Sequence, residues 1–305
     1  MAVVHDAPVR VRVPATSANV GPGYDSFGLA LARHDVVCAE VTGDRLVVNV
    51  TGEGADDVPR DRTHLVVSSL LAGLDAWADE RPDGLRLDCV NRLPHSRGLG
   101  SSAAAIVAGL MAARALLDGV DVGDADLLDL SSRLEGHPDN VAACLLGGFT
   151  VSWTAADGRA HGARLQPHRD VHPVVCVPGW PMSTEQARGL IPAQVSHADA
   201  VFNVARSALL VAALTQRPDL LLEATQDRLH QPYRAESMRP TADVVQRLRA
   251  EGVAAVVSGA GPSVLALPVG DEDPADAVRR VAGDDWSVEY LPIDLDGARD
   301  LTASE

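Results

Sequence analysis

A glycine-rich loop between a predicted strand and a predicted helix most constrains what this chain can fold into. The loop runs Pro94-His95-Ser96-Arg97-Gly98-Leu99-Gly100-Ser101-Ser102-Ala103-Ala104. Gly98 and Gly100 allow positive φ angles and a close approach of the backbone to a ligand. Ser101 or Ser102 can cap the alanine-rich helix predicted over 101–117, whose first N–H groups and positive dipole end attract phosphate. A plain glycine turn with a serine cap explains these residues about equally well, so both interpretations stay open here.

Two further loops combine glycine with polar residues. One runs Pro14-Ala15-Thr16-Ser17-Ala18-Asn19-Val20-Gly21-Pro22-Gly23-Tyr24-Asp25-Ser26-Phe27-Gly28. A hairpin turn uses the same residue types, but it explains poorly the length of this loop and the placement of Asn19 and Asp25. The other loop, 258–263 (SGAGPS), lies between two predicted strands. It is either an ordinary hairpin loop or a glycine-rich loop that packs against a substrate or against the 94–104 loop.

The absence of lysine excludes several chemistries. All 26 basic residues are arginine, so the chain has no P-loop lysine, no Schiff-base lysine and no lysine general base. The 42 acidic residues bring the formal net charge to −16, which disfavours binding to nucleic acid or to an anionic membrane. An anionic cofactor is still compatible, because backbone amides at a helix start hold phosphate locally.

Nothing in the sequence predicts export or membrane insertion. The first residues lack a basic patch followed by an apolar core. Apolar runs such as 103–113 stay well short of the roughly 20 residues that span a bilayer. The four cysteines form no CxxC pair, which argues against a zinc ribbon or a disulfide framework. We therefore expect a cytoplasmic protein without a membrane or nucleic-acid partner.

Strand and helix patterns alternate in both halves of the 305-residue chain. Strand-like segments cover 9–13, 34–41, 46–50, 85–90, 149–153, 171–177, 254–258 and 263–267. Helical spacing covers 63–79, 101–117, 124–134, 140–146, 198–214 and 241–249. Because several strands are adjacent in sequence, an α+β fold is favoured over a doubly wound parallel sheet. The polar stretch 155–169 predicts a domain boundary, with domains at 1–165 and 166–305.

Six segments, in order, resemble the GHMP family of small-molecule kinases, which is named after galactokinase, homoserine kinase, mevalonate kinase and phosphomevalonate kinase. PATSANVGPGYDSFG is similar to the first motif of the homoserine kinases in that family, PHSRGLGSSAA to the family's phosphate loop, and SGAGPS to its third motif. The segments EGHPDN at 135–140 (followed by Gly147-Gly148), STEQAR at 183–188 and HQPYR at 230–234 also match. The phosphate loop alone is specific for the family but not for a substrate.

This resemblance implies a two-domain fold and a reaction. The N-terminal domain is expected to bind ATP and to be similar to the second domain of ribosomal protein S5, and the C-terminal domain to be ferredoxin-like. The implied reaction is ATP-dependent phosphorylation of L-homoserine to O-phospho-L-homoserine in threonine biosynthesis, with Mg²⁺. Many relatives are dimers, so a homodimer is consistent with the resemblance, although the sequence does not fix the oligomeric state.

The resemblance also assigns residues to ATP and the metal. All of the phosphate loop would bind ATP: Pro94, His95, Ser96, Arg97, Gly98, Leu99, Gly100, Ser101, Ser102, Ala103 and Ala104. The catalytic residues would be Ser101, Ser102, Glu135 and Asn140. Ser102 and Glu135 would hold Mg²⁺, with Asp129 as the alternative acidic ligand. Some relatives have an aspartate base where this chain has Asn140, so direct transfer of the hydroxyl proton to phosphate is expected, with Asp139 as a less favoured base.

Homoserine is a zwitterion, and the resemblance assigns it ligands of both charges. The expected substrate-binding residues are Asn19, Asp25, His137, Thr184, Arg188, Arg234 and Gly259. The planar fork of an arginine binds a carboxylate through two parallel hydrogen bonds, so Arg188 and Arg234 would hold the carboxylate. Asp25 and Asn19 would face the ammonium and hydroxyl ends.

Three other functions would use some of the same residues. One is a GHMP kinase with another substrate, but mevalonate kinases typically carry a lysine in the first motif and galactokinases a GEHxDY-like signature, both absent here. Another is a non-catalytic nucleotide-binding regulator of the same fold, which would lack the acidic metal ligand. The third is a serine hydrolase using Ser101, His137 and Asp139, but the chain has no GxSxG elbow.

Overall fold

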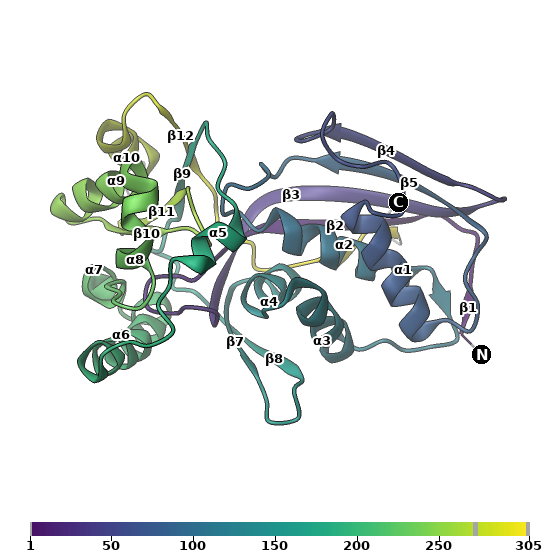
Figure 1. Cartoon of the computed structure of the whole chain (residues 1–305), viewed down its shortest axis with the longest axis horizontal. Helices are drawn as coiled ribbons and strands as arrows, with labels where there is room; N and C mark the ends of the chain where they lie inside the picture. Colours follow the sequence, from purple (N-terminus) through teal and green to yellow (C-terminus); the bar gives the residue numbers. More distant parts are fainter. Residues whose placement is uncertain (1, 271–273, 303–305) are drawn as a thin grey trace.

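The computed structural model describes residues 2–270 and 274–302 and arranges them around two sheets. A seven-stranded sheet and a four-stranded sheet lie side by side along the long axis of the molecule (Figure 1). A separate pair of short strands, β1 (Val3–Val4) and β6 (Leu117–Asp118), is antiparallel. The predicted α+β fold class is confirmed.

The large sheet has the order β13-β2-β3-β5-β4, with β7 paired to β3 and β8 paired to β7. Its strands are β2 (Val9–Ala18), β3 (Phe27–Thr42), β4 (Leu46–Gly52), β5 (Gly84–Asn91), β7 (Phe149–Thr154), β8 (Ala160–Leu165) and β13 (Arg299–Asp300). β4 and β5 pair in parallel, and the other pairs of this sheet are antiparallel. Along the start of β2, Val9, Val11 and Val13 are buried while Arg10 and Arg12 point outward, as the alternating sequence predicts.

Four helices cover one face of the large sheet (Figure 1). They are α1 (Leu65–Trp77), α2 (Ser101–Ala115), α3 (Asp124–Glu135) and α4 (Asp139–Leu146). The small residues of α2 let it pack closely, because a Cβ on Gly109 would lie 2.4 Å from the backbone oxygen of Val66 in the neighbouring helix. This packing fixes α2 so that its first turn, directly after Gly100, faces the middle of the molecule.

The small sheet has the order β10-β11-β9-β12 and is antiparallel throughout. Its strands are β9 (Val174–Pro178), β10 (Ala254–Val257), β11 (Val264–Leu267) and β12 (Trp286–Tyr290). The helices α9 (Arg239–Ala250) and α10 (Pro274–Ala282) share a core with one face through Val244, Leu248 and Val278. On the other face, Val175 and Leu265 join the larger core, which also includes Leu210 of α6 (His197–Thr215).

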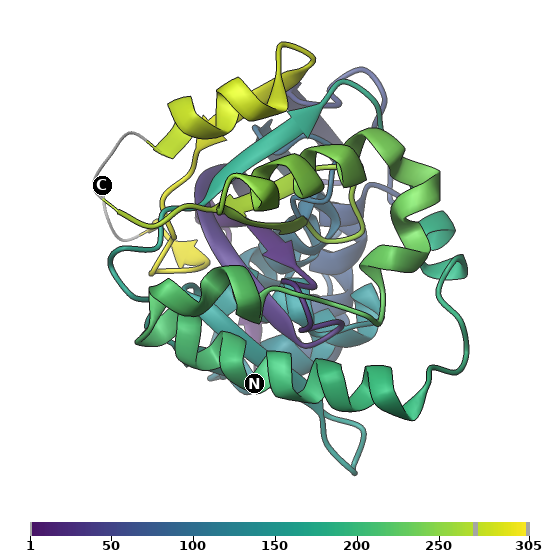
Figure 2. The same ribbon diagram turned by 90° about the vertical axis from the view of Figure 1, so that its left-hand side faces the viewer.

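The remaining helices of the described chain are short, and two of them carry residues of the predicted site, Thr184 and Arg188 on one and Arg234 on the other. These short helices are α5 (Thr184–Gly189), η1 (Pro218–Leu220), α7 (Leu221–Ala224), α8 (Gln231–Arg234) and η2 (Ala235–Met238). Figure 2 shows the long helix α6 crossing this end of the molecule beneath them. By length and composition alone α6 could cross a membrane, with 22% of its apolar window buried in the structure. The expected absence of a membrane partner therefore stays a prediction.

The chain returns to the large sheet at its C-terminal end. The backbone N–H of Ala32 donates to Pro292 O at 2.8 Å, and β13 pairs with β2. Asp294 lies against His34 of β3, with 2.5 Å between Oδ2 and Nε2. The structure thus places the residues after β12 beside the N-terminal half, and the division at 165/166 stays a prediction.

Several elements differ from their predicted extent. β2 continues to Ala18 and β3 begins at Phe27, so much of the expected 14–28 loop is strand. β8, α10 and β12 were not predicted. β8 has one strand neighbour and half-exposed residues along most of its length, so its sequence carries little apolar pattern.

Candidate active site

The three glycine-rich loops converge where the two sheets meet. Ser258 Oγ lies 2.6 Å from Gly98 O and 2.8 Å from Ser17 Oγ. The backbone N–H of Gly259 donates to Ala18 O at 2.9 Å. The 258–263 loop therefore joins β10 and β11 as a hairpin and also packs against the 94–104 loop, so both expectations for it hold.

Two glycines of the 94–104 loop are required by this close packing. Gly98 has φ +71°, and a Cβ there would lie 2.2 Å from Ser258 O. Gly100 has φ +69°, and a Cβ there would lie 1.9 Å from Thr16 Oγ1. Any side chain at either position would separate the loops as well as strain the backbone.

The first turn of α2 is capped differently from the prediction. Its N-cap is Gly100, without a side-chain hydrogen bond, so the expected serine cap is wrong. The helix begins at Ser101, which puts both serines inside the first turn, and its first ladder bond runs from Ala104 N to Gly100 O at 2.9 Å. The N–H groups of residues 101–103 precede that ladder and form the anion-attracting end of the helix.

The other residues of the loop support its path. Leu99 is buried, and His95 lines a cavity beside the loop. Arg97, the one cation of the loop, donates to Pro178 O at 3.1 Å and to Gly179 O at 2.9 Å. Its guanidinium therefore ties the loop to the end of β9 through carbonyl oxygens.

Ser102 lies beside Glu135, the favoured partner for a metal. The Ser102 hydroxyl donates to Glu135 Oε2 at 2.8 Å. Burial raises the pKa of Glu135, and the hydrogen bond from Ser102 partly opposes this shift. A hydroxyl and a carboxylate are hard oxygen donors of the kind that Mg²⁺ prefers.

Asp129, the alternative acidic ligand, lies elsewhere. Its Oδ1 accepts a hydrogen bond from the N–H of Ala160 at 3.1 Å, and its Oδ2 accepts from Arg133 at 2.6 Å. It is buried between α3 and β8. It does not line either of the two cavities that lie beside the 94–104 loop. The structure therefore favours Glu135 over Asp129. Among residues 2–270 and 274–302, no group of three or more His, Cys, Asp or Glu side chains could hold a metal alone.

A cavity of about 130 Å³ opens at the start of α2 and is walled by both halves of the chain. Its lining consists of Asn19, Ser96, Gly98, Gly100, Ser101, Ser102, Glu135, His137, Asn140, Thr184, Arg188, Arg234, Gly259 and Ala260. Every residue predicted to bind substrate is in this lining except Asp25. The structure thus brings together residues from six separate sequence segments.

Asp25 sits directly behind the lining and pairs with Arg188. Arg188 Nη2 lies 2.5 Å from Asp25 Oδ1, and Nη1 lies 3.2 Å from Oδ2. The N–H of Asp25 donates to Asn19 Oδ1 at 2.8 Å, and both residues have positive φ, 53° and 54°. The unusual backbone of this turn therefore places a carboxylate and a guanidinium together at one wall of the cavity.

Arg234 is the largest fully buried side chain, with 1% of its surface exposed. Its Nε donates to Ala187 O at 3.1 Å, and its Nη1 lies 3.4 Å from Gly259 O. Within the described residues, no Asp or Glu oxygen comes within ion-pair distance of it. A buried guanidinium without a carboxylate at the wall of a cavity is suited to an anionic ligand.

His137 and Asn140 are both held by Asp139. His137 Nδ1 lies 2.5 Å from Asp139 Oδ1, which also accepts the N–H of Asn140 at 2.8 Å. Burial lowers the pKa of His137, but the hydrogen bond and charge of Asp139 outweigh it, so the pKa lies above its usual value. Asn140 Oδ1 accepts from the Thr16 hydroxyl at 2.8 Å. Thr184 begins α5 at the opposite wall.

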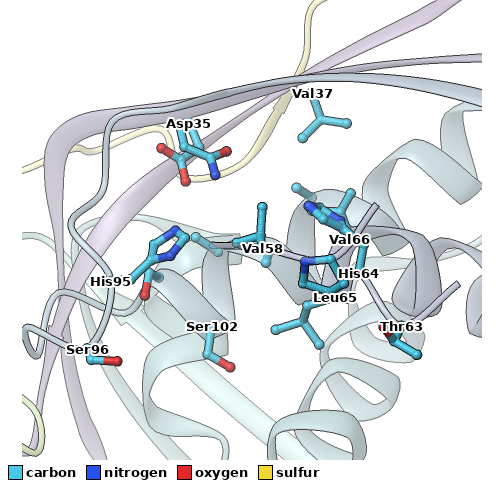
Figure 3. Close-up of a pocket in the computed structure, with 16 residues that line it drawn as sticks. Asp35, Val37, Val58, Thr63, His64, Leu65, Val66, His95, Ser96 and Ser102 are labelled. Atoms are coloured by element: carbon cyan, nitrogen blue, oxygen red, sulfur yellow. The ribbon is translucent and has the colours of Figure 1, made fainter. Parts of the chain in front are cut away.

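A second cavity of about 290 Å³ adjoins the first and was not predicted from the sequence. The two cavities share Ser96, Ser101 and Ser102. Figure 3 shows the second cavity between α1, β3 and the loop, with His64, Leu65 and Val66 on one side and Asp35 and His95 on another.

The polar groups of this second cavity are buried with few partners. Burial lowers the pKa of His64, and its Nδ1 has no hydrogen-bond partner among the described residues. Asp35 accepts the backbone N–H groups of Arg92 and Leu93 at 2.5 and 3.0 Å, and burial raises its pKa. These residues lie in segments without a motif, so only their spatial proximity to the loop reveals them.

Comparison with known proteins identifies the relatives of this arrangement. The model of the GHMP kinases N-terminal domain matches residues 64–148, and that of the GHMP kinases C-terminal domain matches 209–287. The homoserine kinase of Streptomyces coelicolor is 53% identical over 98% of this chain and 97% of its own, and that of Mycobacterium tuberculosis 49% identical over 92% and 90%. The crystal structure of homoserine kinase from Cytophaga hutchinsonii superposes with a TM-score of 0.84 at 27% identity, covering 96% of this chain and 97% of its own. Mevalonate kinase of L. major shares the fold, with a TM-score of 0.72 at 17% identity over 95% of this chain and 98% of its own.

Proposed function

Because the chain belongs to the GHMP kinase family, and within it to the homoserine kinases, we propose that it phosphorylates L-homoserine with ATP. The γ-phosphoryl group passes to the side-chain hydroxyl and gives O-phospho-L-homoserine and ADP, a step of threonine biosynthesis. The observation that carries this conclusion is the charge pattern at the smaller cavity, where Arg188 and Arg234 line the wall and Asp25 pairs with Arg188 behind it. Two guanidinium groups and a carboxylate complement the carboxylate and ammonium groups of an amino acid.

The phosphates of ATP would lie along the loop between the two cavities. The N–H groups at the start of α2 and the positive end of this 15-residue helix favour negative charge. The larger cavity has apolar walls, including Val37, Val58 and Val66, and would take the nucleoside. In this proposal the terminal phosphate would lie at Ser101 and Ser102, which line both cavities.

Mg²⁺ belongs to the proposal, with Ser102 and Glu135 as its protein ligands. Their hydroxyl and carboxylate oxygens lie 2.8 Å apart and are the donor type that the ion takes. When bound, Mg²⁺ neutralises charge on the phosphates. Because the ion keeps several water and phosphate ligands, two protein oxygens suffice for such a site.

The residues of the chain act mainly by positioning in this proposal. Arg188 and Arg234 orient the substrate carboxylate, and Asn19 and His137 line the path to its hydroxyl. Asn140 is an amide and takes no proton at neutral pH. Asp139 is fully buried behind His137 and Asn140, so we propose that the hydroxyl proton passes directly to the phosphoryl group.

The serine hydrolase alternative lacks the geometry it would need. His137 is paired through Nδ1 with Asp139 as in a catalytic triad, but among the described residues no hydrogen bond joins the Ser101 hydroxyl to His137. A nucleophilic serine instead hydrogen-bonds the histidine that removes its proton.

We place the enzyme in the cytoplasm, without a membrane or nucleic-acid partner, consistent with its net charge of −16. A homodimer is also part of the proposal. Val201 and Val204 of α6 are 55% and 71% exposed, which leaves apolar surface on that helix for a second copy. Sedimentation velocity distinguishes a 32.0 kDa monomer from a dimer.

A coupled ADP-release assay tests the proposed reaction. The purified chain is given ATP and Mg²⁺ with homoserine, mevalonate, galactose or serine in turn. We expect ADP release that depends on homoserine and exceeds that with the other three acceptors. Turnover of homoserine no faster than of the others would refute the substrate, and ATP binding without turnover of any acceptor would favour the regulator alternative.

A further inference from the structure

We propose that Asp227 and His230 are positioning residues that hold the guanidinium of Arg234 in the orientation the substrate carboxylate requires. This inference rests on the proposed function and adds two residues that the sequence motifs did not assign. Neither residue lines the substrate cavity. Both are expected to act only through Arg234.

Arg234 needs such support because its own helix cannot provide it. α8 has four residues, and an isolated turn of this length has little stability of its own. Nε and Nη1 of Arg234 have protein acceptors, namely Ala187 O, Gly259 O and His230 Nδ1. Among the described residues no acceptor is found for Nη2, which leaves this nitrogen for a ligand.

The hydrogen bonds of His230 fix which of its nitrogens faces Arg234 as an acceptor. His230 Nε2 lies 2.7 Å from Gly21 O, and because a carbonyl oxygen only accepts, Nε2 carries the proton. Nδ1 then presents its lone pair to Arg234 Nη1 at 3.3 Å. A ring protonated on both nitrogens would instead turn an N–H toward the guanidinium.

The surroundings of the ring favour this neutral form. His230 is fully buried, and burial lowers its pKa although the charge of Asp227 opposes the shift. Arg234 and Asp25 are the other charged groups that act on the ring, and Tyr24 packs against it with 5.2 Å between ring centroids.

Asp227 fixes the backbone that carries this ring. Its Oδ2 accepts the N–H groups of His230 and Gln231 at 3.1 and 2.8 Å. Its Oδ1 accepts the N–H of Leu229 at 2.8 Å and the side-chain amide of Asn203, on α6, at 3.0 Å. The carboxylate thus ties the start of α8 to the long helix α6.

The chain of contacts from α6 through Asp227 and His230 ends at Arg234 Nη1. Because Nη1 is fixed at one end of the planar guanidinium and Nε at the other, the plane has one orientation. A carboxylate that approaches Nη2 therefore meets a preorganised donor, which is what binding a small substrate tightly requires.

Two substitutions of His230 separate its two hydrogen bonds. The amide oxygen of His230→Asn takes the place of Nδ1 and keeps an acceptor for Arg234. His230→Gln reaches Gly21 O with its amide N–H and removes that acceptor. We expect His230→Gln to raise KM for homoserine about tenfold with KM for ATP within a factor of two, and His230→Asn to stay within threefold of the parent for both. His197→Gln, at an exposed histidine on α6, is the matched control and should change neither constant.

The decisive measurement is a double-mutant cycle with Arg234→Leu. If His230 acts through Arg234, adding His230→Gln to Arg234→Leu causes no further loss of kcat/KM for homoserine. Additive losses would overturn the inference, as would a loss in which the KM for ATP rises in parallel. If the thermal transition shows that the His230→Gln variant does not fold, the His230→Asn variant tests the inference by itself. A tenfold rise in its KM for homoserine would also overturn the inference. Turnover of homoserine by the parent enzyme tests the proposed function separately, and that test does not depend on the result of the double-mutant cycle.

Discussion

Replacing Arg234 by leucine tests whether its guanidinium binds the substrate carboxylate. An exposed ion pair contributes about 0–1 kcal/mol, but Arg234 is 1% exposed, so this range does not apply to it. Breaking a buried charged pair costs about 2–5 kcal/mol. Because Arg188 remains to hold the carboxylate, we expect the lower half of that range, roughly a 30- to 300-fold loss of kcat/KM for homoserine.

The same substitution is also expected to lower the stability of the fold. Leucine leaves Ala187 O and Gly259 O without their donor, at about 1–3 kcal/mol for each buried group left unpaired. Removing a buried cation that has no carboxylate partner in the described structure offsets part of that cost. A thermal transition that stays well above the assay temperature shows that the kinetic loss belongs to the site.

The assay varies homoserine at saturating ATP and then ATP at saturating homoserine. The KM for ATP should stay within a factor of about two, because the phosphate loop is a different segment. Arg239→Leu, at a side chain that is 74% exposed, is the control and should leave both constants unchanged. Parent and Arg234→Leu should turn over 3-aminopropan-1-ol, which is homoserine without its carboxylate, about equally slowly. Homoserine kinetics within a factor of about three of the parent, under 1 kcal/mol, would refute the assignment.

Three further predictions concern the metal, the loop and the C-terminal return. Glu135→Gln should raise the Mg²⁺ concentration for half-maximal activity about tenfold, whereas Asp129→Asn should lower the thermal transition without changing the Mg²⁺ titration. Gly98→Ala should cost about 1–3 kcal/mol in urea unfolding and raise the KM for ATP, because the residue has φ +71° and its Cβ meets a backbone oxygen. The pKa of Asp294 lies below 3.8, since the hydrogen bond from His34 and nearby N–H groups outweigh burial. Its contribution to stability is therefore complete above about pH 4 and lost as the pH falls through the folded value, and Asp294→Asn should flatten the acid limb of urea-unfolding stability measured from pH 7 to pH 3.

The elements of the fold that were predicted are those with their own pattern. α1 and α2 have long apolar or alanine-rich sequences, and their predicted positions agree with the structure to within a few residues. β2 continues through Pro14 to Ala18 because its second half is buried on both sides and pairs with β3, which a turn-like composition conceals. Tertiary packing decided those residues, and local sequence did not.

The residues of the site also form two groups, those predicted from a sequence motif and those brought to the site by packing alone. Residues inside glycine-rich or family-like motifs, such as Asn19, Glu135 and Arg188, were predicted from the sequence, and in the structure they line one cavity. Asp35 and His64 lie in segments with ordinary strand and helix patterns, and only the packing of α1 beside the phosphate loop brings them to it. His230 lies inside a matched motif, yet its contact with Arg234 depends on a proton position set by Gly21 O.

The absence of lysine gives the arrangement of the remaining cations particular weight. Arg97, the one cation in the phosphate loop, is engaged by the carbonyl oxygens of Pro178 and Gly179 at the end of β9. It therefore couples the loop to the small sheet, and in the proposed reaction the phosphates would be held by backbone N–H groups and Mg²⁺. Arg188 and Arg234 line the smaller cavity, where the proposed substrate carboxylate would meet two guanidinium groups. We therefore propose that a chain with net charge −16 binds two anionic groups side by side because one, the phosphates, would meet backbone N–H groups and Mg²⁺ and the other, the substrate carboxylate, would meet guanidinium groups.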